Sequence, residues 1–219
     1  MAEDILYRVE DLKQENRDLN RAIVDIAQLV SDSRTEEMIN FLIKKLNDYF
    51  GPHTLCFFVQ PPRSGKLRQY YFTNLNQMVD QLPKECFYIF QSYFENLDIP
   101  SNNGFAYPFN DLINSIDSDF PKELLDTNTK YVIPLISIGG VFSIIFIGEK
   151  SDNTAYSYSE LSYMHRIFSV MAVTMQNGLH YEVSITEPKT GLFTYDYFKT
   201  RVEECIGNCK RYTRTAAML

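Results

Sequence analysis

The chain has 219 residues, of which 45% are hydrophobic and 22% charged, and its formal net charge is −7. These values are typical of one globular domain with extensions. The negative charge argues against nucleic acid as a partner, because phosphate binding needs a basic face. No apolar run reaches the length of a membrane span, and the polar N-terminus is unlike a signal peptide. We therefore expect no membrane partner and a cytoplasmic location.

Residues 1–32 carry two apolar series that repeat every seven residues. The series at the a positions is Val9, Asn16, Ile23 and Val30, and the series at the d positions is Ile5, Leu12, Leu19 and Ile26. β-Branched residues at a with leucine at d favour a parallel two-stranded coiled coil, and one buried Asn penalises other registers and oligomers. The pattern predicts a homodimer. The alternative is an amphipathic helix that packs on its own domain.

Residues 33–180 alternate helical and strand patterns. The predicted strands are 55–59, 67–73, 131–137 and 141–149, and the predicted helices are 33–50, 75–97 in two pieces, 120–125 and 157–185. Pro134 indicates an edge position or a bulge, the glycines at 139 and 140 indicate a tight hairpin, and the apolar strand 141–149 should be central. This order predicts an α+β fold, in which a small antiparallel sheet has its helices on one side.

The long helix 157–185 has an apolar stripe at three-and-four spacing. Its members are Leu161, Met164, Phe168, Met171, Met175 and Leu179. We expect the first half of the stripe to belong to the core. The second half should run past the end of the sheet and form a second dimer seam.

The sequence offers no catalytic or metal-binding constellation. Cys56 and Cys86 lie in apolar patterns, so we expect them to be small buried side chains. Cys205 and Cys209 share one face of a predicted helix, but a metal site would need two further ligands nearby. We therefore predict no catalytic residue, no metal and no required cofactor.

Residues 187–192, Glu187-Pro188-Lys189-Thr190-Gly191-Leu192, interrupt the helical pattern. Pro188 breaks the preceding helix because its φ is fixed and it has no N–H. Thr190 can cap a new helix, and Gly191 tolerates backbone angles that other residues avoid. The segment is predicted to be a tight joint between two helices, the second of which spans 197–212.

The same residues resemble the Asp-Pro-Leu-Thr-Gly-Leu-x-Asn-Arg opening of GGDEF-type diguanylate cyclase domains. The matching residues are Pro188, Thr190, Gly191, Leu192 and Phe198, whereas Glu187 replaces the Asp, and Thr194 and Tyr195 stand where Asn and Arg are expected. Residues 181–219 would then be a signalling helix and the beginning of a truncated GGDEF-like domain. In that family, metal and GTP binding lie further on, around a Gly-Gly-Asp/Glu-Glu-Phe turn. The resemblance therefore implies no catalysis in this chain.

Residues 33–180 resemble a GAF domain, which is a PAS-like sensory fold. The resemblance is carried by Tyr49-Phe50-Gly51, the strand 55–59, the hairpin from Tyr131 to Gly148 and the helix that opens Tyr158-Ser159-Glu160-Leu161. It implies a small-molecule pocket between sheet and helices, with the segment 102–116 as its wall.

In that wall, Phe105, Tyr107 and Phe109 could stack a planar ligand, and Asn110 and Asp111 could bind it through hydrogen bonds. Cyclic nucleotides are one ligand class of the family, although its usual Asn-Lys-x-Phe-x-Asp-Glu signature is not visible here. The alternative is that these aromatic residues fill the core of a domain that binds nothing.

Together the two resemblances imply a dimeric regulatory module of a diguanylate cyclase. A small-molecule effector, such as a cyclic nucleotide, would favour one of two dimer arrangements, and the joint at 187–192 would transmit the change. The alternative function is a non-enzymatic dimeric adaptor that binds a protein partner.

Overall fold

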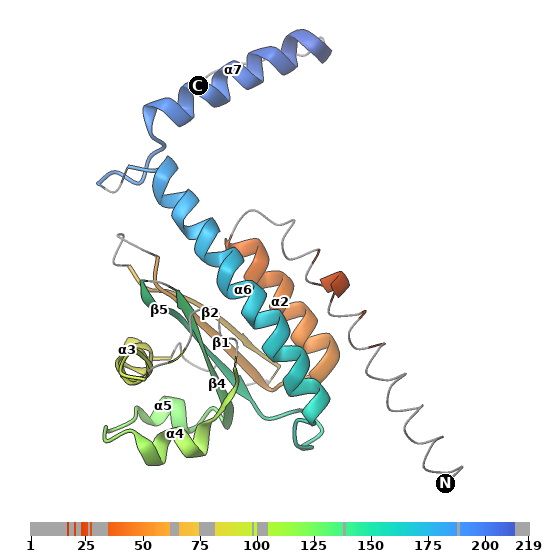
Figure 1. Cartoon of the computed structure of the whole chain (residues 1–219), viewed down its shortest axis with the longest axis vertical. Coiled ribbons are helices and arrows are strands. Elements are labelled where there is room, and N and C mark those ends of the chain that lie inside the picture. The colour runs from red at the N-terminus through yellow and green to blue at the C-terminus, as the bar shows by residue number, and fades with distance from the viewer. Residues whose placement is uncertain are drawn as a thin grey trace.

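The computed structural model describes residues 35–61, 66–74, 82–97, 99, 105–137, 139–187 and 189–212, together with 17, 20, 23–25 and 27, except for the side chains of 182 and 212. Its centre is a five-stranded antiparallel sheet of order β2-β1-β5-β4-β3 (Figure 1). The strands are β1 (Thr54–Val59), β2 (Arg68–Thr73), β3 (Tyr107–Pro108), β4 (Thr129–Ser137) and β5 (Gly140–Gly148). The helices are α2 (Thr35–Phe50), α3 (Lys84–Glu95), α4 (Phe109–Ser115), α5 (Lys122–Leu125), α6 (Tyr158–Ile185) and α7 (Tyr195–Tyr212). The predicted α+β class with an antiparallel sheet is confirmed.

The middle of the sheet agrees with the strand predictions. β5 lies between β1 and β4, so its predicted central position is confirmed. β4 and β5 form a hairpin at Gly140, whose φ of 105° is open mainly to glycine. β3 pairs with residues 131–132 of β4, and among the described residues this pairing does not extend to Pro134. A register shift follows between Leu135 and Ile136.

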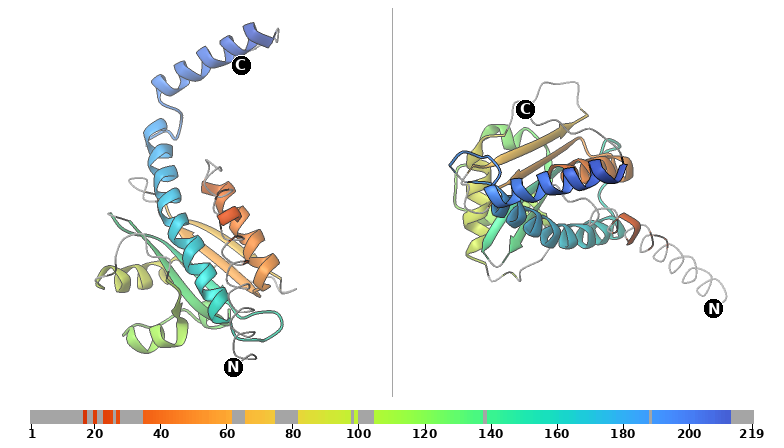
Figure 2. Two further views of the ribbon diagram at one scale, coloured as in Figure 1. Left: turned by 45° about the vertical axis from the view of Figure 1, so that its right-hand side comes forward. Right: turned by 90° about the horizontal axis from the view of Figure 1, so that it is seen from above.

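Helices cover both faces of the sheet, so the prediction of helices on one side is wrong. α2 and α6 lie on one face, and α3, α4 and α5 on the other, as the views in Figures 1 and 2 agree. Successive β1 residues alternate between the two cores: Phe57 belongs to the first, and Cys56 and Phe58 to the second. A strand buried on both faces is apolar throughout, and this explains the unbroken apolar runs of β1 and β5.

The apolar stripe of α6 is core along its whole length. Met175 is fully buried and Leu179 is 1% exposed, and both belong to the cluster formed with α2 and the sheet. Phe50, at the C-terminal end of α2, contacts Tyr163 in the first turns of α6, with ring centroids 5.6 Å apart, so the two helices are antiparallel neighbours. The predicted second dimer seam is therefore wrong for this stripe, because α2 and the sheet already cover it.

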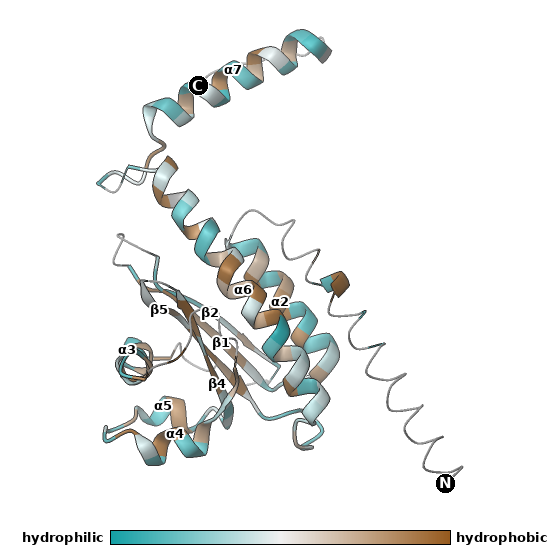
Figure 3. Ribbon diagram, viewed as in Figure 1, coloured by the Kyte–Doolittle hydropathy of each residue, from teal (hydrophilic) through white to brown (hydrophobic). Residues whose placement is uncertain are grey.

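α7 projects away from the sheet-and-helix body (Figure 2). Hydrophobic and hydrophilic bands alternate along it in Figure 3, and Tyr195, Phe198 and Ile206 are exposed. None of the described helices combines the length and the apolar character that crossing a bilayer requires.

Candidate functional site

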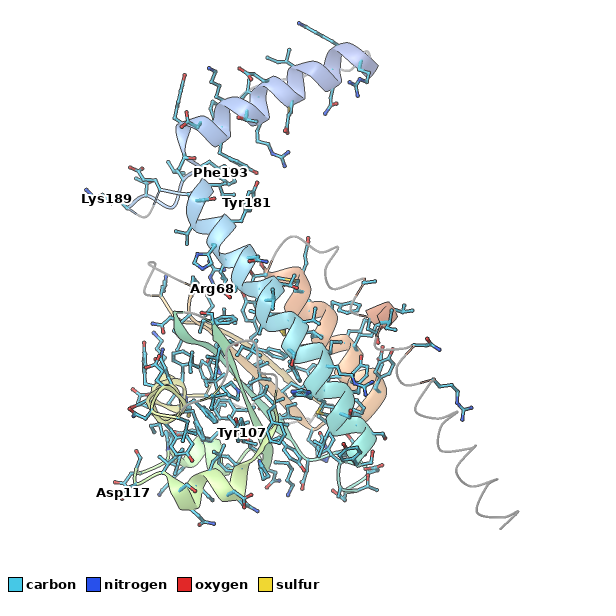
Figure 4. All side chains as sticks on the ribbon, viewed as in Figure 1. Arg68, Tyr107, Asp117, Tyr181, Lys189 and Phe193 are labelled. Atoms are coloured by element: carbon cyan, nitrogen blue, oxygen red, sulfur yellow. The ribbon has the colours of Figure 1, made fainter. Side chains whose placement is uncertain are left out.

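The three aromatic residues of the predicted pocket wall differ in burial, since Phe105 is exposed, Tyr107 is half-buried and Phe109 lies in the core. Phe109 is 5% exposed and packs between Phe90 and Phe120, with ring centroids 6.2 and 6.4 Å away. Tyr107, labelled in Figure 4, is half-buried at the edge of the sheet, and Phe105 lies against it with ring centroids 5.2 Å apart. The structure thus brings Phe105 and Tyr107 together and places Phe109 in the core.

The space between the sheet and α3 is filled largely by phenyl rings. The buried rings of this cluster are Phe58, Phe87, Phe90, Phe94, Phe109 and Phe146. Neighbouring pairs have centroids between 5.3 Å (Phe90 and Phe146) and 6.4 Å (Phe90 and Phe94) apart, which is the usual range of aromatic packing. This packing fits the alternative that the aromatic residues stabilise the domain.

The two polar residues of the predicted wall separate. Both Asn110 and Asp111 are exposed on α4. Asn110 lines a surface pocket of about 380 Å³, whereas Asp111 is not among its lining residues. The backbone carbonyl of Asp111 accepts a hydrogen bond from Ser115 at 2.8 Å. The role of the two side chains in ligand binding stays a prediction.

This surface pocket lies where β3, β4, α4 and the segment before α6 meet. Its lining residues are Pro108, Asn110, Thr129, Lys130, Tyr131, Glu149, Asn153, Thr154, Ala155 and Tyr156. The rings of Tyr131 and Tyr156 meet edge to face, with centroids 5.6 Å apart. Lys130 Nζ lies 3.4 Å from Glu149 Oε2. The pocket therefore combines an aromatic surface with one cation and one anion.

The pocket wall continues directly into the first turn of α6. Ser157 caps this helix: its hydroxyl accepts from the Glu160 N–H, and the Glu160 carboxylate accepts from the Ser157 N–H at 2.6 Å. Lys150 is buried, pairs with Glu160 at 2.7 Å and lies over the Tyr156 ring. Tyr156 donates to the Gly148 carbonyl at 2.8 Å, and burial, followed by the charge of Glu160, raises its pKa. A molecule bound here would contact Tyr156, the residue directly before the cap of α6.

A second polar cluster joins the N-terminal helical segment to α2 and α6. The Asp25 carboxylate is 1% exposed and accepts hydrogen bonds from the hydroxyls of Tyr49 and Tyr163, each at 2.9 Å. Lys45 Nζ lies 2.8 Å from the same carboxylate. The hydrogen bond to Asp25 raises the pKa of Lys45 although burial opposes it. Asp25 had no role in the heptad pattern, so sequence reasoning missed this contact.

Most of the predicted coiled-coil seam lies outside the described residues. This applies to Val9, Leu12, Asn16, Leu19, Ile26 and Val30. Ile23 is described, and its side chain is 60% exposed, while Asp25 two residues later faces α2 and α6. The helix thus contacts its own domain through Asp25 and leaves one seam residue accessible. The homodimer stays a prediction.

The segment after α6 is a compact hydrogen-bonded hairpin. Thr186 and Phe193 form an antiparallel bridge, the Glu187 N–H donates to the Leu192 carbonyl at 2.7 Å, and the Gly191 N–H donates to the Glu187 carbonyl at 2.8 Å. Gly191 has a φ of 70°. The prediction of a tight joint between two helices is confirmed, and Pro188 lies outside the described residues.

Thr190 does not cap the second helix, so that prediction is wrong. α7 begins at Tyr195, two residues before the predicted start. The Thr190 hydroxyl instead donates to the Glu187 carboxylate at 2.7 Å and accepts from the Leu192 N–H at 3.3 Å, inside the hairpin. The physical reason is that Thr190 makes its hydrogen bonds to Glu187 and Leu192 within the hairpin, so its hydroxyl does not bond the N–H groups at the start of α7.

Aromatic contacts fix α7 against the end of α6. The Tyr197 ring lies 4.8 Å from the Phe193 ring and 6.5 Å from the Tyr181 ring, measured between centroids. In Figure 4, Tyr181 and Phe193 lie beside the end of α6, whereas Lys189 projects from the tip of the hairpin. The direction in which α7 leaves the domain is therefore set by backbone hydrogen bonds and by ring packing.

The cysteines divide into two classes. Cys56 and Cys86 are 2% and 0% exposed, which confirms the prediction of buried thiols, and burial raises the pKa of each to about 12. Cys205 is exposed on α7, and Cys209 is half-buried. Within the described part of the chain, no group of three or more His, Cys, Asp or Glu side chains could hold a metal ion.

Comparison with solved structures finds a likeness in fold. The GAF domain of a two-component sensor histidine kinase from Bacillus halodurans is similar, with a TM-score of 0.47 and 17% sequence identity, over 68% of this chain and 99% of that domain. No protein-family model matches the sequence, and no curated protein matches it. At this identity and score the likeness assigns no family, and the fold class rests on the sheet and helices described above.

Proposed function

We propose that the chain is the sensory, GAF-like module of a diguanylate cyclase, that it works as a homodimer, and that it has no catalytic activity of its own. The observation that supports this proposal best is the course of α6. This helix of 28 residues begins beside the surface pocket and ends in the hairpin at 186–193. At about 1.5 Å per residue it spans roughly 42 Å.

The mechanism follows from the chemistry of the cyclase family that the hairpin resembles. Two GTP molecules condense to cyclic di-GMP only when two catalytic domains face each other, so the geometry of the dimer controls the rate. A ligand acts only through different affinities for two dimer arrangements. A difference of a few kcal/mol, expressed through α6 and the hairpin, changes the populations of the two states substantially.

The Asp25 cluster supports coupling between the two ends of the module. Asp25 binds Tyr49 of α2 and Tyr163 of α6, so the N-terminal helical segment is tied to the helix that leads to the hairpin. Ile23, on the same segment, remains exposed for a second copy. A change in how the N-terminal helices of two protomers pack against each other would therefore also affect α6.

Three observations test the proposal. Light scattering after size-exclusion chromatography should give twice the 25.5 kDa of one chain. A mass of one chain at working concentration contradicts the dimer. Purified protein with GTP and magnesium should form no cyclic di-GMP, and the coding sequence after codon 219 should continue into a Gly-Gly-Asp/Glu-Glu-Phe turn. A frame that stops there, or continues without this turn, contradicts the link to a cyclase.

The second candidate function is a dimeric adaptor that binds a protein partner. The observation that favours it is the apolar surface at the hairpin and along α7, formed by the exposed side chains Leu192, Phe193, Tyr195, Phe198 and Ile206. An adaptor would use this surface without a catalytic domain after it. The same reading of the coding sequence separates the two functions.

A further inference from the structure

The surface pocket beside α6 is lined by two chemically distinct sets of residues. One set is apolar or aromatic, and consists of Tyr131, Tyr156, Pro108 and Ala155. The other set includes a pair of opposite charges, since Lys130 Nζ and Glu149 Oε2 are 3.4 Å apart. The formal charges cancel, so the pocket as a whole attracts neither a strong anion nor a strong cation. It suits a ligand with both charges close together and an apolar remainder.

We propose that this pocket binds a free α-amino acid with an apolar side chain. The carboxylate of the ligand binds Lys130, its ammonium group binds Glu149, and its side chain packs on the tyrosine rings. The volume of about 380 Å³ is near the lower end of small-molecule pockets, which start at roughly 300 Å³. This size fits an amino acid, whereas the phosphate of a nucleotide would face the Glu149 carboxylate.

The two charged groups can bind a ligand while they remain paired. A lysine ammonium has three donors and a carboxylate about four acceptor sites, so one ion pair leaves both with free capacity. Glu149 is held in place because Asn128 Nδ2 donates to its Oε1 at 3.2 Å. The Lys130 side chain is 49% exposed, so its end can turn toward a ligand carboxylate. Asn110 adds an amide to the lining.

The position of the pocket connects ligand binding to α6. Residues 153–156 line the pocket and lead into Ser157, the cap of α6. Occupancy restrains this segment, and with it the capped first turn. The regulatory meaning of the site rests on the sensory function proposed above, whereas the binding chemistry does not.

The test is isothermal titration calorimetry on the full chain with L-phenylalanine and L-leucine. We expect a dissociation constant between about 10 μM and about 1 mM for at least one of them. Phenethylamine lacks the carboxylate and 3-phenylpropionate lacks the ammonium group, so each should bind at least about tenfold more weakly than L-phenylalanine. Cyclic AMP serves as the anionic comparison and should not bind.

Two charge variants locate the binding. Lys130→Gln and Glu149→Gln should each weaken amino-acid binding about tenfold, because each removes one charge-assisted hydrogen bond. Lys122→Gln, on the exposed face of α5, is the matched control and should bind like the unmodified protein. Melting temperatures of all three variants show that they fold, and amide NMR shifts at Ala155 report directly on the pocket.

Each outcome decides one question. The inference is overturned if neither amino acid binds at about 5 mM, if the analogues bind equally well, or if cyclic AMP binds instead. Hydrogen exchange at the Gly191 N–H, measured with and without the amino acid, tests the proposed function separately. Binding without any change there supports the pocket and contradicts transmission to the hairpin. Absence of binding leaves a sensory function through another ligand intact.

Discussion

Replacement of Asp25 is the most direct test of how the N-terminal segment is attached to the domain. Asp25→Ala removes a carboxylate that is 1% exposed and binds two hydroxyls at 2.9 Å and an ammonium at 2.8 Å. The hydroxyls of Tyr49 and Tyr163 then lose their hydrogen bonds to Asp25, and the ammonium of Lys45 loses its ion pair with Asp25. The free energy of unfolding should fall, because hydrogen bonds to a buried charged group stabilise the folded state.

The expected size of the loss follows from these contacts. A hydrogen bond to a charged group contributes about 1.5 kcal/mol at the lower end of the measured range, so two contribute about 3 kcal/mol. The ion pair adds little, because Lys45 is 25% exposed and solvent screens it. We therefore expect Asp25→Ala to cost about 3 kcal/mol, and Asp25→Asn less, since the amide oxygen still accepts one hydroxyl.

Urea denaturation followed by circular dichroism measures this loss, since the chain has no Trp for fluorescence. Asp48→Ala is the matched control, because Asp48 lies exposed on α2 near the same cluster. A double-mutant cycle between Asp25→Ala and Tyr163→Phe should give a coupling of about 1.5 kcal/mol. If Asp25→Ala stays within about 0.5 kcal/mol of the control, the cluster does not hold the segment and the reasoning is refuted.

Three further predictions concern the core and the thiols. In urea denaturation, Gly148→Ala should lower the free energy of unfolding by more than about 2 kcal/mol, because the new Cβ overlaps Thr54. The control Gly207→Ala, whose Cβ has nothing within 4 Å, should raise it by about 0.5–1 kcal/mol. Equal effects of the two substitutions would contradict the close approach of Thr54 to Gly148. A thiol reagent at neutral pH should modify Cys205 and Cys209 quickly and the other two thiols only in urea. The buried thiols of Cys56 and Cys86 should stabilise the folded state fully below about pH 9, and this contribution should be lost between about pH 9 and 12. In that range only the unfolded chain releases the thiol protons, because the pKa of each thiol in the folded state is about 12. A free energy of unfolding that does not change over this range refutes the burial argument.

The sequence predicted four of the five strands and the joint because their signals are local, whereas the two-residue strand β3 was not predicted. The apolar run of β1, the glycines of the β4–β5 hairpin and the break after α6 each lie within a few residues. What it did not predict depends on contacts between distant segments. The residues that bury Met175 come from α2 and the sheet, so the stripe looked available for a dimer. Which face of α6 is covered can be decided only once α2 has been placed beside it.

The pocket and the Asp25 cluster show the same limit. Lys130 and Glu149 belong to different strand ends, and only the pairing of β4 with β5 brings them within 3.4 Å. The link between Asp25 and Tyr163 spans 138 residues. The cap Ser157, by contrast, has a local signal that the sequence analysis did not use, since Glu160 follows it at capping-box spacing.

Because the hairpin at 186–193 connects α6 to α7, the direction in which α7 leaves the domain depends on the number of residues in α6. Since backbone bonds define the turn, each residue inserted into α6 before it would rotate α7 by about 100° and advance it by about 1.5 Å. Insertions of one or two residues would aim α7 in a wrong direction, while seven would nearly restore it, about 20° out of phase. To keep the direction of α7, the part of α6 between the core and the turn can therefore change in length only by about seven residues at a time. This holds whichever side chains that part carries.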